Sequence, residues 1–162
     1  MAIKTGDRLP DATFLIFDDE SGPGEVQLRE KLEGRKVVIF GLPGAYTRTC
    51  TAAHMPSFVR NADALREKGI DEIICISVND PFVLAQWGKD TGAAEAGITI
   101  LGDSAAEYSK AIGMSFTAPP VGFYDRSKRY AMVVEDGVVL TLDEDEPGTC
   151  NTSGGEYILS TL

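Results

Sequence analysis

Residues 36–59 read KVVIFGLPGAYTRTCTAAHMPSFV, and this stretch organises the whole chain. Its first seven residues, 36–42, form a nearly continuous apolar run, which is typical of a strand buried on both faces of a parallel sheet. A Pro-Gly turn follows the run. From Cys50 onward, apolar residues recur at helical spacing until Gly69 ends the pattern. The stretch therefore predicts a strand, a turn and a helix, with a cysteine where the helix begins.

The position of Cys50 favours a reactive thiolate. The first turn of a helix has unpaired backbone N–H groups, and the aligned peptide dipoles place partial positive charge there. Both features stabilise a thiolate over a thiol, and free cysteines otherwise titrate at about 8.5. The alternative is a buried cysteine that acts as a small hydrophobic residue, as most free cysteines do. The surrounding Thr, Gly and Pro residues favour the reactive role.

Three neighbours of Cys50 affect the predicted helix. Thr49 is a suitable N-cap residue. Pro56 falls inside the helix, where it removes the backbone hydrogen bond to the carbonyl of Ala52 and should kink the axis. His54 lies four residues after Cys50, which puts it on roughly the same face of the helix.

The remaining pattern alternates strands and helices. Apolar pieces at 13–17 and 26–28 indicate a hairpin or edge strands, with a helical turn at 28–33. Further strands are expected at 72–78, 97–101, 121–124, 130–134 and 138–142, and helices at 81–89, at 104–112 with Ser104 as its cap, and at 156–162. Asp136-Gly137 is typical of a hairpin turn. This order predicts an α/β fold, with a mixed central sheet and helices on both faces.

Length and composition predict one globular domain spanning residues 1–162. A chain of 162 residues buries roughly 70% of its unfolded surface without needing disulfides. The formal charge of −10 argues against nucleic acid or an anionic membrane as partner. No run reaches the roughly 18 apolar residues of a membrane span, and the N-terminal residues lack a signal-peptide core. We therefore expect a cytoplasmic protein.

The cysteine and histidine counts argue against a bound metal. Cys50, Cys75 and Cys150 are an odd number without a C-x-x-C pair, and His54 is the single histidine. A structural zinc site needs four such ligands. No dinucleotide- or phosphate-binding loop is recognisable either. The sequence thus predicts neither a metal nor an organic cofactor.

The spacing Pro43-x3-Thr47-x2-Cys50, with Gly44 after the proline, resembles the active-site signature of the peroxiredoxins. The longer segments GLPGAYTRTCTAAHMPSF, CISVNDPFVLAQW and RSKRYAMVVEDGVV resemble the subfamily that contains mammalian peroxiredoxin five and the plant type II enzymes. The resemblance implies a thioredoxin-like fold and a thiol-dependent peroxidase that reduces hydrogen peroxide and small organic hydroperoxides. It also implies a homodimer packed through the active-site face.

The resemblance assigns roles to the residues of this motif. Cys50 is expected to attack the peroxide and become a sulfenic acid, the first reversible step of thiol oxidation. Thr47 is expected to bond the thiolate and the peroxide, although a threonine there also suits a plain turn. Pro43 is expected to fix the loop and shield the thiolate, and Gly44 lets the backbone approach a ligand closely.

A basic residue of the segment RSKRYAMVV completes the expected site. The last arginine of this block, Arg129, is the one that reaches the cysteine in the family, and its fork of donors can bond thiolate and peroxide together. Charges in such a run otherwise face solvent, and the preceding segment PPVGFYD departs from the expected pattern. His54 is expected to support the site, either charged and favouring the thiolate, or neutral and bonded to the backbone.

Three thiols compete to resolve the sulfenic acid. Cys75 matches a cysteine of plant type II members but lies in the apolar run EIICISV. Cys150 lies near the C-terminal position that mammalian members use, in a loop that favours access. The third is an external thiol, from glutathione with glutaredoxin or from thioredoxin, and access decides among them as much as thiolate character does.

Two other functions are compatible with a reactive cysteine on this fold. A general disulfide oxidoreductase usually carries C-x-x-C, whereas Cys50 is followed by Thr51-Ala52-Ala53. A non-enzymatic thioredoxin-fold redox sensor would react once and signal to a partner. Turnover distinguishes them, because a peroxidase consumes many equivalents of peroxide when a thiol is supplied.

Overall fold

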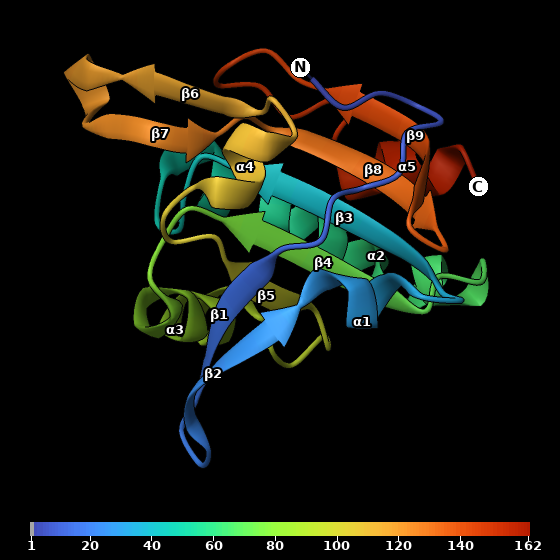
Figure 1. Cartoon of the computed structure of the whole chain (residues 1–162), viewed down its shortest axis with the longest axis horizontal. Coiled ribbons are helices and arrows are strands. Elements are labelled where there is room, and N and C mark those ends of the chain that lie inside the picture. Colours follow the sequence, from blue (N-terminus) through green and yellow to red (C-terminus); the bar gives the residue numbers. More distant parts are fainter. Residues whose placement is uncertain (1) are drawn as a thin grey trace.

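The computed structural model describes residues 2–162 and is built around a seven-stranded mixed sheet (Figure 1). The strand order is β2-β1-β5-β4-β3-β8-β9. The strands are β1 (Thr13–Asp18), β2 (Gly22–Gln27), β3 (Lys36–Leu42), β4 (Glu72–Ser77), β5 (Thr99–Gly102), β8 (Tyr130–Glu135) and β9 (Val138–Glu144). β3, β4 and β5 run parallel, whereas β8 pairs antiparallel with β3 and β9.

Helices cover both faces of this sheet, as predicted. They are α1 (Leu28–Leu32), α2 (Met55–Glu67), α3 (Pro81–Thr91), α4 (Glu107–Ala111) and α5 (Gly155–Ser160). In Figure 1, α1 and α4 lie in front of β3 and β4, and α2 lies behind them. The helices predicted at 81–89 and 156–162, and the helical turn at 28–33, are therefore confirmed within a few residues.

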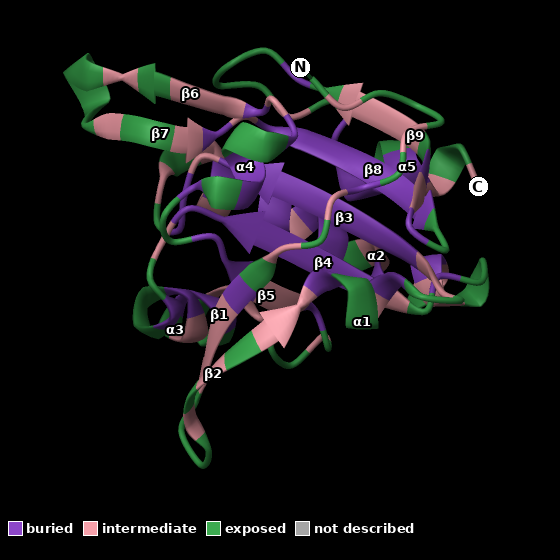
Figure 2. Ribbon diagram, viewed as in Figure 1, coloured by how far each residue is buried: buried purple, intermediate pink, exposed green. Residues whose placement is uncertain are grey.

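The buried strand at the centre explains this layering. Along β3, Val38 and Phe40 belong to a core cluster that includes side chains of α2, α3 and α5. Val37 and Ile39 alternate with them and belong to a second cluster that includes side chains of α1 and α4. Because side chains of a strand alternate between the two faces, an apolar run without polar interruptions requires cover on both. Figure 2 shows the resulting buried centre of the sheet.

Most predicted strands are confirmed, including the first hairpin, in which β1 pairs with β2 from Thr13↔Gln27 to Asp18↔Gly22. The strand predicted at 121–124 is found two residues later, as β7 (Phe123–Ser127), whereas its partner β6 (Ser115–Ala118) was not predicted. The two strands form a separate hairpin that projects from the body of the molecule (Figure 1). The tip contains a 3-10 turn at Pro119–Val121, because consecutive prolines supply no N–H to a sheet.

The cap predicted for the fourth helix is also wrong. The Asp103 carboxylate, not Ser104, accepts hydrogen bonds from the backbone N–H groups of Tyr108 (3.1 Å) and Ser109 (2.8 Å) at the start of α4. The Ser104 hydroxyl donates to the Asn79 carbonyl at 2.8 Å instead. The left-handed backbone of Ala106 (φ 61°) delays the helix, so that the earlier aspartate reaches its first turn.

The helix that carries Cys50 differs from its prediction at Thr49 and contains a wider turn just before Pro56. It begins at Arg48, so Thr49 has helical backbone angles and its side chain makes no cap hydrogen bond. A π-helical turn, η1 (Cys50–His54), precedes α2. In η1 the backbone N–H of Met55 bonds the carbonyl of Cys50. Pro56 has no N–H to donate, and it lies where this wider turn passes into the α-helix.

No helix within residues 2–162 combines the length and the apolar content needed to cross a membrane.

Candidate active site

Cys50 lies in the first turns of the helix that follows β3, and its side chain is fully buried. The guanidinium of Arg129 donates from Nη2 to Cys50 Sγ at 3.3 Å. The two residues are 79 positions apart in the sequence and meet because β8, which follows Arg129, pairs with β3. A permanently charged guanidinium is therefore in direct contact with the buried sulfur.

The Arg129 side chain is almost completely buried, at 4% exposure. Its Nη1 contacts Nδ1 of His54 at 2.8 Å, and its Nε has no hydrogen-bond partner in the described part of the chain. A buried charge is costly unless a counter-charge or hydrogen bonds compensate it. A neighbouring anion would stabilise the buried guanidinium. Of the two side chains that it contacts, His54 and Cys50, the cysteine is the one that can become an anion.

His54 is a neutral imidazole in this site. Its Nε2 lies 2.9 Å from the carbonyl oxygen of Ser153, which can only accept, so Nε2 carries the proton. Nδ1 is then the acceptor for Arg129 Nη1. Burial, followed by the charge of Arg129, lowers the pKa of His54 to about 3. Of the two states considered from the sequence, the geometry favours the neutral one, which links Arg129 to the backbone of Ser153.

Thr47 and Gly44 are bonded to each other in the loop before the helix. The Thr47 hydroxyl donates to the Gly44 carbonyl at 2.7 Å, and no hydrogen bond joins Thr47 to Cys50 in the described residues. Thr47 lines the same cavity as Arg129, which contacts Cys50, and its hydroxyl proton is engaged by the Gly44 carbonyl. A Cβ at Gly44 would meet the end of the Arg126 side chain, which would have to shift to make room for it.

Side chains that the sequence did not single out hold this loop in place. Arg126 Nη1 donates to the Pro43 carbonyl at 2.9 Å, and the guanidinium of Arg126 lies over the Phe123 ring. The Asn79 side chain accepts from the backbone N–H of Ala45 at 3.0 Å. In the sequence, Arg126 is one of three cations in the run 126–129, and Asn79 precedes an Asp-Pro pair that is typical of a turn, so neither carries a local signal for this role.

Tyr46 is the strained residue of the same loop. Its φ of 62° is unusual for a residue with a side chain, and its hydroxyl donates to Asp90 on α3 at 2.6 Å. Half of its surface is exposed, at 51%. The hydrogen bond to α3 helps to offset the backbone strain, and the turn directs Thr47 toward the cavity.

A cavity of about 910 Å³ opens beside Arg129 and Thr47, and its lining is mostly apolar. One side is the loop and the start of the helix, and the other is the projecting β6–β7 hairpin with the chain after β9. Residues that line it from the hairpin are Phe116, Ala118, Val121 and Phe123. The arrangement provides a guanidinium and a hydroxyl at the edge of an apolar opening.

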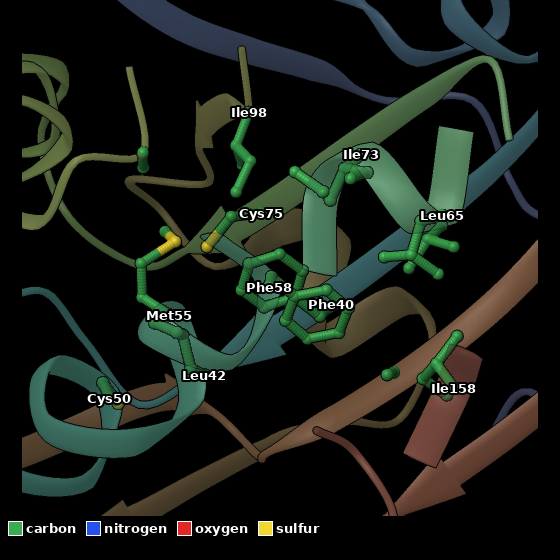
Figure 3. Close-up of a cluster of buried hydrophobic side chains, with 14 of the residues drawn as sticks. Phe40, Leu42, Cys50, Met55, Phe58, Leu65, Ile73, Cys75, Ile98 and Ile158 are labelled. Carbon is green, nitrogen blue, oxygen red and sulfur yellow. The ribbon is translucent and has the colours of Figure 1, made fainter. Parts of the chain in front are cut away.

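The two other cysteines lie in different surroundings. Cys75 is in β4, fully buried among apolar side chains such as Met55, Phe58 and Ile98 (Figure 3). Burial raises the pKa of Cys75 well above its ordinary value. Cys150 is partly exposed in the loop after β9, and burial again raises its pKa while Arg129 opposes that shift. All three cysteines are free thiols.

Within residues 2–162, no group of three or more His, Cys, Asp or Glu side chains is arranged to hold a metal ion.

A family model described as Redoxin matches residues 4–159. The chain belongs to this family. It is 42% identical over 163 residues to Peroxiredoxin-2E-2, chloroplastic, of Oryza sativa subsp. japonica. The aligned region covers 99% of this chain and 72% of that relative. The chain is thus a peroxiredoxin of the type II, peroxiredoxin-five-like branch, and a thiol-dependent peroxidase, as the motif predicted.

Solved structures of peroxiredoxins share its fold. Reduced Prx3 of Vibrio vulnificus in complex with H2O2 superposes with a TM-score of 0.91 at 38% identity, covering 98% of this chain and 95% of that one. Peroxiredoxin 5 of Alvinella pompejana superposes with a TM-score of 0.84 at 30% identity, covering 98% and 97%. The thioredoxin-like fold implied by the resemblance is therefore confirmed.

Proposed function

We propose that Cys50 is the peroxidatic residue of this peroxiredoxin, with Arg129 holding its thiolate. The observation that carries the proposal is the buried contact between Arg129 Nη2 and Cys50 Sγ at 3.3 Å. The thiolate attacks the terminal oxygen of ROOH, a sulfur–oxygen bond forms, and the oxygen–oxygen bond breaks. Sulfur is oxidised by two electrons to Cys50 sulfenic acid, and the leaving RO⁻ takes a proton to become an alcohol, or water when the substrate is hydrogen peroxide.

Charge develops on the leaving oxygen during this step, and donors aimed at it accelerate the reaction. The buried Nε of Arg129, which lacks a partner in the described chain, is suited to this oxygen. The Thr47 hydroxyl is the second donor, released from the Gly44 carbonyl by rotation about its side chain. Pro43 lines the same opening and excludes water from the sulfur, while Gly44 keeps the loop close to Arg126.

The substrates proposed are hydrogen peroxide and small organic hydroperoxides. The apolar cavity beside Thr47 and Arg129 supports the organic class, because an alkyl group placed there leaves water while the peroxide reaches the donors. The similarity to a peroxiredoxin solved in complex with H2O2 supports the inorganic one.

An external thiol is proposed to resolve the sulfenic acid, either glutathione with glutaredoxin or thioredoxin. That thiol attacks sulfur, water leaves, and a mixed disulfide forms; a second thiol then releases Cys50. The complete burial of Cys75 in β4 weighs against it as the resolver. Cys150 is the stronger competitor within the chain, since its loop is partly exposed. Mass spectra after one equivalent of peroxide, for the wild type, Cys75→Ser and Cys150→Ser, distinguish an internal disulfide from a sulfenate that adds glutathione.

The subunit arrangement, the domain organisation and the cellular location are also proposals. A homodimer through the active-site face is supported by exposed apolar side chains beside the cavity, among them Val121. A single domain is supported by the Redoxin match over residues 4–159. A cytoplasmic location is supported by the three free thiols. The names of relatives include chloroplastic and mitochondrial proteins, so cell fractionation is the test of location.

The central test compares the wild type with Cys50→Ser in a peroxide-consumption assay with dithiothreitol as reductant. Cys50→Ser should lose catalytic turnover, because a serine hydroxyl is not ionised at neutral pH. Cys75→Ser is the matched control, since it removes an equally buried sulfur, and it should retain turnover. Unchanged consumption by Cys50→Ser would overturn the assignment. A single equivalent consumed by the wild type would instead favour a redox sensor.

A further inference from the structure

The Asp145 carboxylate, at the end of β9, organises the loop that carries Cys150. Its two oxygens accept five hydrogen bonds from three consecutive residues. The backbone N–H groups of Asn151, Thr152 and Ser153 donate at 2.7, 3.1 and 3.0 Å, and the hydroxyls of Thr152 and Ser153 at 3.1 and 2.6 Å. Asp145 is 92% buried, because its exposed fraction is 8%. A carboxylate bonded in this way fixes the path of the loop.

The same loop ends on the active site. The Ser153 carbonyl accepts from His54 Nε2 at 2.9 Å. His54 Nδ1 accepts from Arg129 Nη1 at 2.8 Å, and Arg129 Nη2 donates to Cys50 Sγ at 3.3 Å. The backbone N–H of Asp145 also donates to the Arg129 carbonyl at 3.0 Å. The main chain of Arg129 is therefore bonded to Asp145 itself, and the tip of its side chain is connected through His54 to Ser153, which Asp145 holds.

We propose that Asp145 is a positioning residue of the peroxidatic site, which acts on Cys50 through Ser153, His54 and Arg129. The carboxylate holds the Ser153 backbone, whose carbonyl fixes the tautomer and the orientation of the His54 ring. The ring then fixes one terminal nitrogen of the guanidinium, so that the other points at sulfur. The inference rests on the roles proposed above for Cys50 and Arg129.

The carboxylate is suited to this task over the working pH range. Burial by itself raises the pKa of Asp145, but the hydrogen bonds from Ser153, Asn151 and Thr152 outweigh burial and lower the pKa to about 2. The acceptor stays ionised wherever the peroxidase operates. Its hydrogen bonds are consequently charge-assisted, and these are roughly twice as strong as neutral ones.

A purely structural role of Asp145 and a direct effect of its charge predict different outcomes. If it only stabilised the loop, its removal would lower the stability of the fold but leave the folded site unchanged. If it acted on Cys50 directly through its charge, its removal would favour the thiolate, because a negative charge nearby disfavours another. The positioning role predicts the opposite sign, since a displaced Arg129 supports the thiolate less well.

The experiment compares Asp145→Asn with Asp143→Asn. Asp143 lies two residues earlier on β9, and its carboxylate makes no hydrogen bond within residues 2–162, so its replacement removes the same charge without disturbing the loop. Two quantities are measured: kcat/KM for hydrogen peroxide, and the pH midpoint of Cys50 alkylation by iodoacetamide in a background lacking Cys75 and Cys150. Asp145→Asn should lower kcat/KM about tenfold and raise the midpoint, because small misplacements of a reacting group are costly. Asp143→Asn should change kcat/KM by less than about twofold, as expected for a screened surface charge.

A second variant keeps the test decisive if Asp145→Asn folds poorly. Ser153→Ala removes one donor to Asp145 and keeps the carbonyl that His54 needs, so it should change both quantities in the same direction by a smaller amount. Thermal unfolding of each variant reports stability separately. In a His54→Leu background the connection is cut, and adding Asp145→Asn should then change kcat/KM by less than about twofold.

A midpoint that falls or stays unchanged in both Asp145→Asn and Ser153→Ala would overturn the inference, as would additive effects in the His54→Leu background. Failure of the site assignment looks different, because peroxide turnover would then survive Cys50→Ser. If Cys50→Ser is inactive and Asp145→Asn behaves like Asp143→Asn, the positioning role of Asp145 is rejected while the peroxidase assignment stands.

Discussion

At the scale of single residues, the site depends on a histidine that stays neutral. A charged imidazolium at His54 would repel the Arg129 guanidinium that it contacts at 2.8 Å. Burial of the ring adds to this and keeps the pKa of His54 at about 3. The histidine therefore serves as a fixed donor and acceptor between the Ser153 carbonyl and the arginine, and it does not exchange protons with Cys50 at neutral pH.

This neutral histidine should make the stability of the fold depend on pH. The pKa of His54 is about 3 in the folded chain and near 6.5 when unfolded, so the unfolded state binds more protons between these values. The contribution of neutral His54 to the free energy of unfolding is complete above the unfolded pKa of 6.5, and it is lost as the pH falls below that value. The slope approaches about 1.4 kcal/mol of unfolding free energy per pH unit. Urea titrations at pH 7, 6 and 5 measure it.

The control for this prediction is His54→Gln. A glutamine amide can donate to the Ser153 carbonyl and accept from Arg129, but it does not titrate. Because His54 is the single histidine of the chain, the difference between the two proteins isolates its proton. Parallel stability curves between pH 7 and 5 would show that the imidazole is not held neutral.

At the scale of elements, the π-helical turn η1 connects the chemistry to the core. Cys50 opens this turn, and Thr51 beside it accepts a hydrogen bond from the indole of Trp87 on α3 at 3.1 Å. Trp87 is fully buried. Because the Cys50 side chain is fully buried as well, the oxygen atom that oxidation adds to its sulfur requires the turn to shift, and we expect this shift to disturb the indole.

The fluorescence of Trp87 should therefore report the oxidation of Cys50. It is the only tryptophan, so the signal has one source. Mixing reduced protein with hydrogen peroxide in a stopped-flow instrument should change the emission at a rate proportional to peroxide concentration. Cys50→Ser should give no such change. Thr51→Val, which removes the acceptor for the indole, should reduce the amplitude; an unaltered signal in Cys50→Ser would refute the coupling.

Elements also show where prediction from sequence succeeds. The apolar run of β3 and the Asp136-Gly137 turn are local patterns, and the structure reproduces both. The π-helical turn was missed because the sequence shows only a proline, and the response of the chain to it depends on packing. The strand β6 and its pairing with β7 were missed because two consecutive prolines and a short strand leave no alternation to read.

At the scale of the whole molecule, the site is assembled from distant segments. The motif around Cys50 identified the nucleophile, and the resemblance pointed to Arg129. The connection from His54 to Ser153 spans 99 residues, and no local pattern announces it. In the sequence, Asp145 is one of four consecutive acidic residues at 143–146, and its five hydrogen bonds exist only once β9 and the following loop are placed. Partners of buried polar groups are the part of a site that sequence patterns predict least.

The surface around the cavity leads to the last prediction. Val121 at the tip of the projecting hairpin and Tyr46 in the active-site loop line the same cavity, with exposures of 64% and 51%. Exposed apolar side chains gathered at one opening are typical of a surface that another protein covers. A second copy that packs there would close the cavity and keep water from Cys50.

If the wild type sediments as the proposed dimer, Val121→Glu should sediment as a monomer, because a carboxylate buried in an apolar interface has no partner. Leu140→Glu is the matched control on β9; Leu140 is 39% exposed and does not line the cavity, so this variant should stay dimeric. The Val121→Glu monomer should also reduce peroxide more slowly, since its cavity is open to solvent. A wild type that sediments as a monomer, or a Val121→Glu variant that remains a dimer, would show that this face is not the subunit contact.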